Sequence, residues 1–187
     1  MKVISSNYSN TVLIDILGNT LPETNIDNSG LHISYVKGME LLASIDQWQV
    51  KELLEYWLKI HPKDKLPCRA DFDPIDVPRI LPHIVMTDIE RDPVRIRFRL
   101  VGTIITTAFN RELTGLYFDE AFENYAEAEG YTQRTELAMD AVPKHFFGKG
   151  KLKYDLDFTS IEWVLLPFAE NGKDVDLVIA ALSYGGE

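Results

Sequence analysis

The side chains that could bind a metal or act as a nucleophile are few and lie far apart in the chain. His32, His61, His83, His145 and the single Cys68 show none of the spacings by which proteins bind zinc. A lone cysteine also excludes an internal disulfide. The sequence therefore argues against a structural metal site and against a disulfide-stabilised fold.

Acid–base catalysis would need a carboxylate or a histidine in an apolar pocket, where burial shifts its pKa. Among the carboxylates of strand-like segments, Asp88 and Glu162 are the candidates, and both are expected to face water or an arginine. The sequence carries no nucleophile elbow, phosphate-binding loop, HExxH motif or dinucleotide-binding glycine fingerprint. It therefore predicts a protein that is not an enzyme.

One predicted strand carries a cationic face that could bind an anion. Arg95, Arg97 and Arg99 form this face by alternating with apolar residues. However, Asp88 and Glu90 lie in the preceding strand, and opposite charges attract each other across a hairpin. Surface ion pairs are the favoured interpretation.

The middle of the chain predicts a hairpin followed by helices. The segments Ile84–Glu90 and Val94–Val101 are strand-like, and the turn between them is built around a proline, whose φ is fixed. A short helix is expected at Thr103–Asn110. A longer, less regular helical region is expected at Asp119–Val142, with an interruption near Gly130.

The last third predicts three antiparallel strands. Apolar residues alternate from Leu152 to Phe158, the run Ile161–Phe168 is almost wholly apolar, and Val175–Ala181 alternates again. Asn171-Gly172, before the last of these segments, is a strong signal for a tight turn.

The clearest helix is amphipathic and is expected at residues 44–61. Ser44 and Gln47 have the spacing of a capping box at its start. Its apolar stripe is expected to pack on the domain itself, and the alternative is a dimer seam that includes Ile45 and Trp48. The stripe consists of Val50, Leu53, Leu54, Trp57 and Leu58.

Residues 1–43 differ in composition from the rest of the chain and are interpreted as an N-terminal extension. Asparagines crowd this segment, and apolar residues alternate around residues 12–16 and again around residues 31–35. This alternation predicts two short strands.

Length, charge and hydropathy limit the possible classes of protein. The 187 residues fit one domain, and 45% apolar residues are ample for a core. The net charge of −10 disfavours binding to nucleic acid or to anionic lipid. Neither a secretory leader nor a membrane-spanning segment is recognisable. The cytoplasm is the expected location.

Four segments carry a family resemblance: Leu66–Pro74, Ile80–Ile84, Phe98–Thr103 and Leu113–Gly115. They resemble a family of small, mostly stand-alone bacterial PAS-domain proteins. The order of the predicted elements also matches, with a hairpin, short helices, one longer helix and a three-stranded meander. The resemblance covers approximately residues 44–184.

The resemblance implies an α+β fold. A five-stranded antiparallel sheet would carry helices on one face, and the amphipathic helix 44–61 would flank a domain of residues 44–187. Proteins of this family sense a ligand, a redox state or a partner, and they usually signal through a flanking helix. The helix 44–61 stands where that element is expected.

The resemblance also bears on cofactors, and none is assigned. Flavin photoreceptors of the PAS class need a cysteine in the helix after the hairpin, and residues 106–111 contain no sulfur. Haem needs an axial ligand on or beside the longer helix, and only His145 is remotely placed. We expect His145 to be a strand-edge histidine and His83 to be a hydrogen-bonded packing residue.

A ligand pocket, if present, should be lined by inward strand positions and by the helix after the hairpin. Aromatic and branched residues at such positions would also fill any α+β core, so the sequence leaves both interpretations open. The predicted ligand-binding residues are Phe98, Leu100, Phe109, Trp163, Leu165 and Ile179.

Three functions follow from these observations. The favoured one is a non-enzymatic sensory module that binds a small apolar or amphipathic molecule, forms a homodimer and passes its signal to a separate effector protein. The alternative is an interaction adaptor with a filled core and an exposed apolar patch at Trp48 or Trp57. A small acid–base enzyme is the least favoured.

Overall fold

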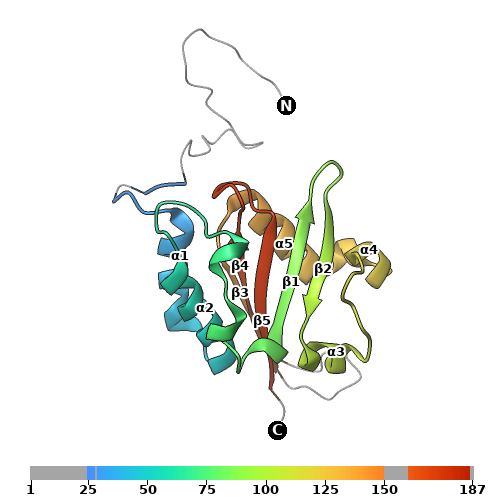
Figure 1. The fold of residues 1–187 in the computed structure, drawn as a ribbon. Coiled ribbons are helices and arrows are strands. Elements are labelled where there is room, and N and C mark those ends of the chain that lie inside the picture. The colour runs from blue at the N-terminus through green and yellow to red at the C-terminus, as the bar shows by residue number, and fades with distance from the viewer. Residues whose placement is uncertain (1–24, 28, 150–159, 186–187) are drawn as a thin grey trace.

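The computed structural model describes residues 25–27, 29–149 and 160–185, and a five-stranded antiparallel sheet lies at its centre (Figure 1). The strand order is β2-β1-β5-β4-β3, which confirms the expected sheet. The strands are β1 (Ile84–Glu90), β2 (Arg95–Val101), β3 (Lys144–Lys149), β4 (Ser160–Phe168) and β5 (Leu177–Gly185).

The hairpin of β1 and β2 contains an irregularity in its register. Met86 pairs with Leu100 and Thr87 pairs with Phe98, so Arg99 is an extra residue in β2. An extra residue of this kind reverses the alternation of side chains beyond it, because successive residues of a strand point to opposite faces.

One face of the sheet, here called the inner face, is covered by three helices. They are α3 (Thr103–Phe109), α4 (Phe118–Ala121) and α5 (Glu129–Asp140), with a 3-10 turn at Tyr125–Glu127. The helical region expected at Asp119–Val142 is divided into α4, this turn and α5, and the interruption precedes Gly130, which lies within α5. The chain enters α3 through Gly102, where a Cβ atom would lie 2.3 Å from the carbonyl oxygen of Pro82. Only glycine fits this approach.

The opposite, outer face carries α1 (Ile33–Leu41) and α2 (Trp48–Ile60), on the left in Figure 1. Helix α2 lies against β4 and β5, and its Trp57 is fully buried and donates a hydrogen bond to the carbonyl oxygen of Pro167 (3.2 Å). The prediction that the apolar stripe packs on the domain itself is confirmed.

Two local predictions for the N-terminal part are wrong. Helix α2 begins at Trp48 rather than Ser44, because Ser44 lies in a 3-10 turn and its hydroxyl donates to the carbonyl oxygen of Leu41. Residues 31–35 do not form a strand, since α1 begins at Ile33, after an N-cap at His32. The strands predicted around residues 12–16 and 152–158 lie outside the described residues.

The remaining turns connect these elements on the outer side. Short 3-10 turns are found at Leu42–Ser44, Arg69–Asp71, Pro74–Asp76 and Leu81–His83. Within the described part of the chain, no helix is both long enough and apolar enough to cross a membrane.

Candidate functional site

A buried arginine lies on the inner face, between α5 and β1. Arg134 comes from α5, and only 6% of it is exposed. Its Nε donates to the hydroxyl oxygen of Thr87 on β1 (3.1 Å), and its Nη1 donates to the carbonyl oxygen of Gly130 (2.8 Å). The guanidinium carbon lies 5.5 Å from the centre of the Phe118 ring. The charge is therefore held between the sheet and an aromatic ring.

The charge of Arg134 has only neutral hydrogen-bond partners. Among the side chains that the structure describes, no carboxylate lies within ion-pair distance of this guanidinium. Burial lowers the pKa of Arg134 to about 10, so the side chain is still protonated at neutral pH. A buried charge without a counter-charge is costly, and it therefore marks this position as a candidate site.

The Phe118 ring beside Arg134 belongs to a cluster of aromatic rings. Phe118 stacks on Phe98 with their ring centres 4.5 Å apart, and Tyr131 lies 5.7 Å from Phe118. Tyr131 also contacts Tyr125 edge-to-face at 5.0 Å. Tyr125 and Tyr131 are only partly buried, so this ring cluster extends from the buried interior to the surface.

Four of the six predicted ligand-binding residues lie on the inner face. Phe98 and Leu165 are buried there, and Phe109 and Trp163 pack against the same cluster. Trp163 also donates from its indole nitrogen to the side-chain oxygen of Gln133 on α5 (2.7 Å).

The other two predicted residues lie elsewhere. Ile179 is buried in the outer cluster, because Val178 and Ala180 take the inward positions of β5. Leu100 is 42% exposed, since the extra residue Arg99 moves it out of the inward series.

Sequence reasoning missed Arg134, although a signal was present. Leu137 and Ala141 follow it at helical spacing and are both buried in the inner cluster. An arginine in line with two buried apolar positions has to be buried as well or extend past them to the solvent.

A second buried charged group lies on the outer side of β4. Glu162 is 1% exposed, and its carboxylate accepts hydrogen bonds from the backbone amides of Asp46 (3.1 Å) and Gln47 (2.6 Å). Its Oε1 lies 2.7 Å from Nε2 of His145 on β3. The prediction that Glu162 faces water or an arginine is wrong. Its carboxylate instead lies at the start of α2, where the helix dipole stabilises a negative charge.

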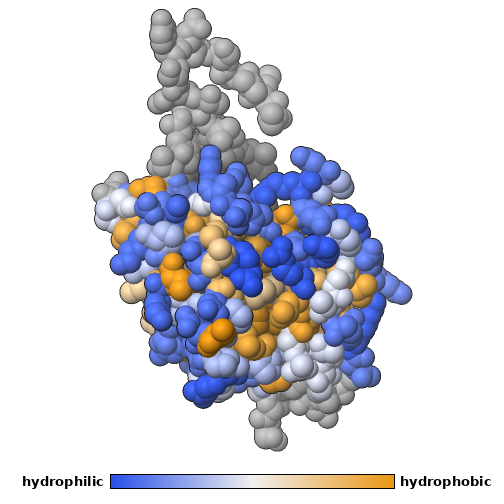
Figure 2. All heavy atoms as spheres, in the orientation of Figure 1, coloured by the Kyte–Doolittle hydropathy of each residue, from blue (hydrophilic) through white to orange (hydrophobic). Residues whose placement is uncertain are grey.

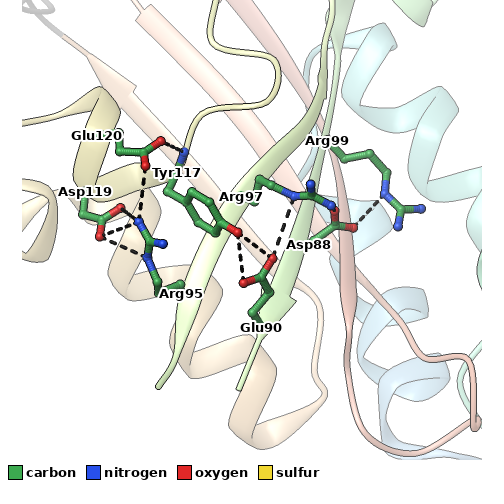
Figure 3. A network of polar contacts seen from close by, with 8 residues as sticks. All are labelled: Asp88, Glu90, Arg95, Arg97, Arg99, Tyr117, Asp119 and Glu120. Carbon is green, nitrogen blue, oxygen red and sulfur yellow. Dashed lines mark hydrogen bonds and ion pairs between the residues drawn. The ribbon is translucent and has the colours of Figure 1, made fainter. Parts of the chain in front are cut away.

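The surface arginines are paired, as predicted (Figure 3). Asp88 lies 2.8 Å from Arg97 and 2.7 Å from Arg99, and Glu90 lies 3.9 Å from Arg97. Arg95 pairs with Asp119 at 2.8 Å. Because each of these arginines has a carboxylate partner, this face is not an open anion site.

His83 has the role expected from the sequence. One of its ring nitrogens, Nδ1, lies 2.9 Å from the carbonyl oxygen of Leu182, and the ring contacts Trp48 edge-to-face. The described side chains contain no group of three or more histidine, cysteine, aspartate or glutamate residues that could hold a metal ion.

A comparison with protein-family models finds a match over residues 45–183, well over half of the chain, to the model described as a PAS domain. No curated protein matches the chain.

Proposed function

The chain belongs to the PAS domain family, and from this premise we propose that it is a non-enzymatic sensory module that binds a small molecule on its inner face and signals through α2. The observation that carries this proposal is the position of β4 between the two faces. Its Trp163 is linked to α5 on the inner face, and the neighbouring Glu162 holds the start of α2 on the outer face.

This arrangement gives a physical route for a signal. A molecule that inserts between α5 and the sheet would change the contact between Trp163 and Gln133, and hence the position of β4. Because Glu162 accepts from two amides at the start of α2, a shift of β4 would change how firmly α2 is held. The ligand can change this equilibrium only by the difference in its affinity for the two states.

The contacts of the candidate acids support a role other than catalysis. Asp88 is engaged by Arg97 and Arg99, and Glu162 by two backbone amides and His145. A general base needs a carboxylate that can reach the proton of a substrate. The oxygens of these two acids are already used in contacts within the fold.

The proposal includes a homodimer and a separate effector protein. Helix α2 covers only part of the outer face, and apolar side chains gather over the lower part of the sheet beside it (Figure 2). A second copy of the chain is the proposed occupant of this surface. Exposed apolar area of this kind is typical of interaction sites.

Native mass spectrometry of freshly purified protein tests the proposal, because it reports a retained molecule and the number of subunits together. We expect a dimer with a non-covalent adduct that is lost after unfolding and refolding in clean buffer. A monomer without any adduct would contradict the proposal.

That contrary result would favour the adaptor function, which one observation supports. Trp48 is 45% exposed, and the guanidinium of Arg79 lies 4.6 Å from its ring centre beside a surface hollow that also includes Lys51. Trp57, the other residue considered for an exposed patch, is fully buried.

A further inference from the structure

The packing of α5 on the sheet does not explain why a charged residue, Arg134, is buried there. Leu137 on α5 and Ala141, the C-cap residue directly after it, are apolar and buried, as expected where a helix covers a sheet. Arg134 brings a full positive charge into this interface. Replacing buried charged groups by apolar side chains of similar volume is often neutral or stabilising, so stability does not account for this residue.

The hydrogen bonds of Arg134 do not remove this cost. The Gly130 oxygen lies in α5, where backbone carbonyls already accept from amides four residues later. The Thr87 hydroxyl, which also lies 3.5 Å from the carbonyl oxygen of Val178, is neutral. Two neutral acceptors orient the guanidinium but leave its charge uncompensated.

The three arginines of β2 differ from Arg134, because their charges are compensated. Arg95, Arg97 and Arg99 lie on the surface, and each is paired with at least one carboxylate. Arg134 is the one buried arginine among the described residues, and no carboxylate of the described side chains pairs with it.

We propose that Arg134 is the anchor for the anionic group of a ligand, and that this ligand is a small monocarboxylate with an apolar or aromatic body. The inference rests on the proposed function, whose binding face it specifies. A single guanidinium balances a single negative charge, and its planar group of donors matches a carboxylate. A doubly charged phosphate monoester would leave one charge unbalanced.

The surrounding rings fit the body of such a molecule. Phe118 lies beside the guanidinium, and Tyr131 and Tyr125 continue from it toward the surface. Aromatic side chains supply apolar contact area and stack on planar groups. A carboxylate at Arg134 would thus place its apolar part among these rings.

Equilibrium dialysis against a defined mixture tests the inference. The mixture contains benzoate, phenylpropanoate, hexanoate and octanoate together with the four corresponding primary amides. We expect the unmodified protein to retain at least one carboxylate in preference to its amide. The Arg134→Met variant should lose this retention by about tenfold or more, as for the loss of a hydrogen-bonded charge pair.

Two controls keep the result interpretable. Arg91→Met makes the same change of charge at an exposed position of the hairpin turn and should retain the carboxylates like the unmodified protein. In denaturant, Arg134→Met should unfold at the same or a higher concentration than the unmodified protein, because it removes an uncompensated buried charge. A clear loss of stability would show that Arg134 is structural and would overturn the inference.

The remaining outcomes separate this inference from the proposed function. Equal retention by the unmodified protein and Arg134→Met, or a preference for the amides, would overturn the role of Arg134 and leave ligand binding intact. If the unmodified protein retains none of the probes and carries no adduct in native mass spectrometry, ligand binding itself is contradicted.

Discussion

Glu162 and Trp163 are consecutive residues of β4, yet one holds the start of α2 on the outer face and the other is hydrogen-bonded to Gln133 of α5 on the inner face. The two-residue period of a strand produces this division. A single strand thus contacts the helices of both layers through neighbouring side chains.

Replacing Glu162 by Gln should loosen the start of α2. The amide nitrogen of glutamine cannot accept a hydrogen bond, so one of the contacts to Asp46, Gln47 and His145 is lost. We expect faster hydrogen exchange at residues 46–52 and a loss of about 1–3 kcal/mol in the free energy of unfolding. The control is Glu55→Gln, at an exposed position of α2, and equal exchange in the two variants would argue against the role of Glu162.

Acidification should destabilise the contact between α1 and α2. His61 and His32 are buried and joined through the hydroxyl of Ser34, with distances of 2.9 and 2.7 Å. Burial and, to a smaller extent, the neighbouring His32 together lower the pKa of His61 to about 4, against the opposing effect of Asp64. The folded state therefore holds His61 in its neutral form.

The direction of the pH effect follows from this pKa. Above about pH 6.5, His61 is neutral in both the folded and the unfolded state, so it adds no pH dependence. As the pH falls from about 6.5 to 4, only the unfolded state gains the proton, and stability should decrease by about 2 kcal/mol, with allowance for solvent screening. Urea unfolding across this range measures the effect. A His61→Gln variant should show a flatter profile, and an unchanged profile would contradict the assignment.

A bulky residue at Gly38 should detach α1 from α2. A Cβ atom at this position would lie 2.8 Å from the Trp57 ring and 3.0 Å from the Leu58 side chain. We expect Gly38→Val to cost about 1–3 kcal/mol through overpacking and to expose the amides of α1 to exchange. Lys37→Val places the same residue at the neighbouring, exposed position and should leave that exchange nearly unchanged. Similar exchange in both variants would show that the close approach of Gly38 to Trp57 is not needed to hold α1 on α2.

Removing the charge of Asp88 should affect stability more than removing that of Asp119. The Asp88 side chain is 10% exposed and serves both Arg97 and Arg99, whereas the Asp119 side chain is 36% exposed. We expect Asp88→Asn to lower the free energy of unfolding by about 1–2 kcal/mol and Asp119→Asn to lower it less. Denaturant unfolding at low and high salt measures both, and an equal effect of the two substitutions would contradict this ranking.

Local patterns were sufficient to predict much of the sheet. The hairpin, α3 and the last two strands follow from alternation, turn residues and apolar runs that a short stretch of sequence contains. The same patterns failed at Ser44, where the expected cap is absent. The amides near the start of α2 are instead satisfied by Glu162, more than a hundred residues away in sequence.

The candidate site was predictable only in part, for the same reason. Phe98, Phe109, Trp163 and Leu165 were assigned to the inner face because their alternation or helical position indicates it. Leu100 was misplaced because the extra residue Arg99 has no signature in the sequence. Arg134 was missed because its significance depends on which groups surround it.

The sequence by itself determined the hairpin, α3, the last two strands, the buried apolar stripe of α2 and the pairing of Asp88 with arginines across the hairpin, because each of these depends on neighbours within a few residues or across a tight turn. The tertiary structure alone decided the surroundings of Glu162 and Arg134. The cost of burying a charge depends on groups that the fold brings together from distant parts of the chain, and no local pattern contains that information.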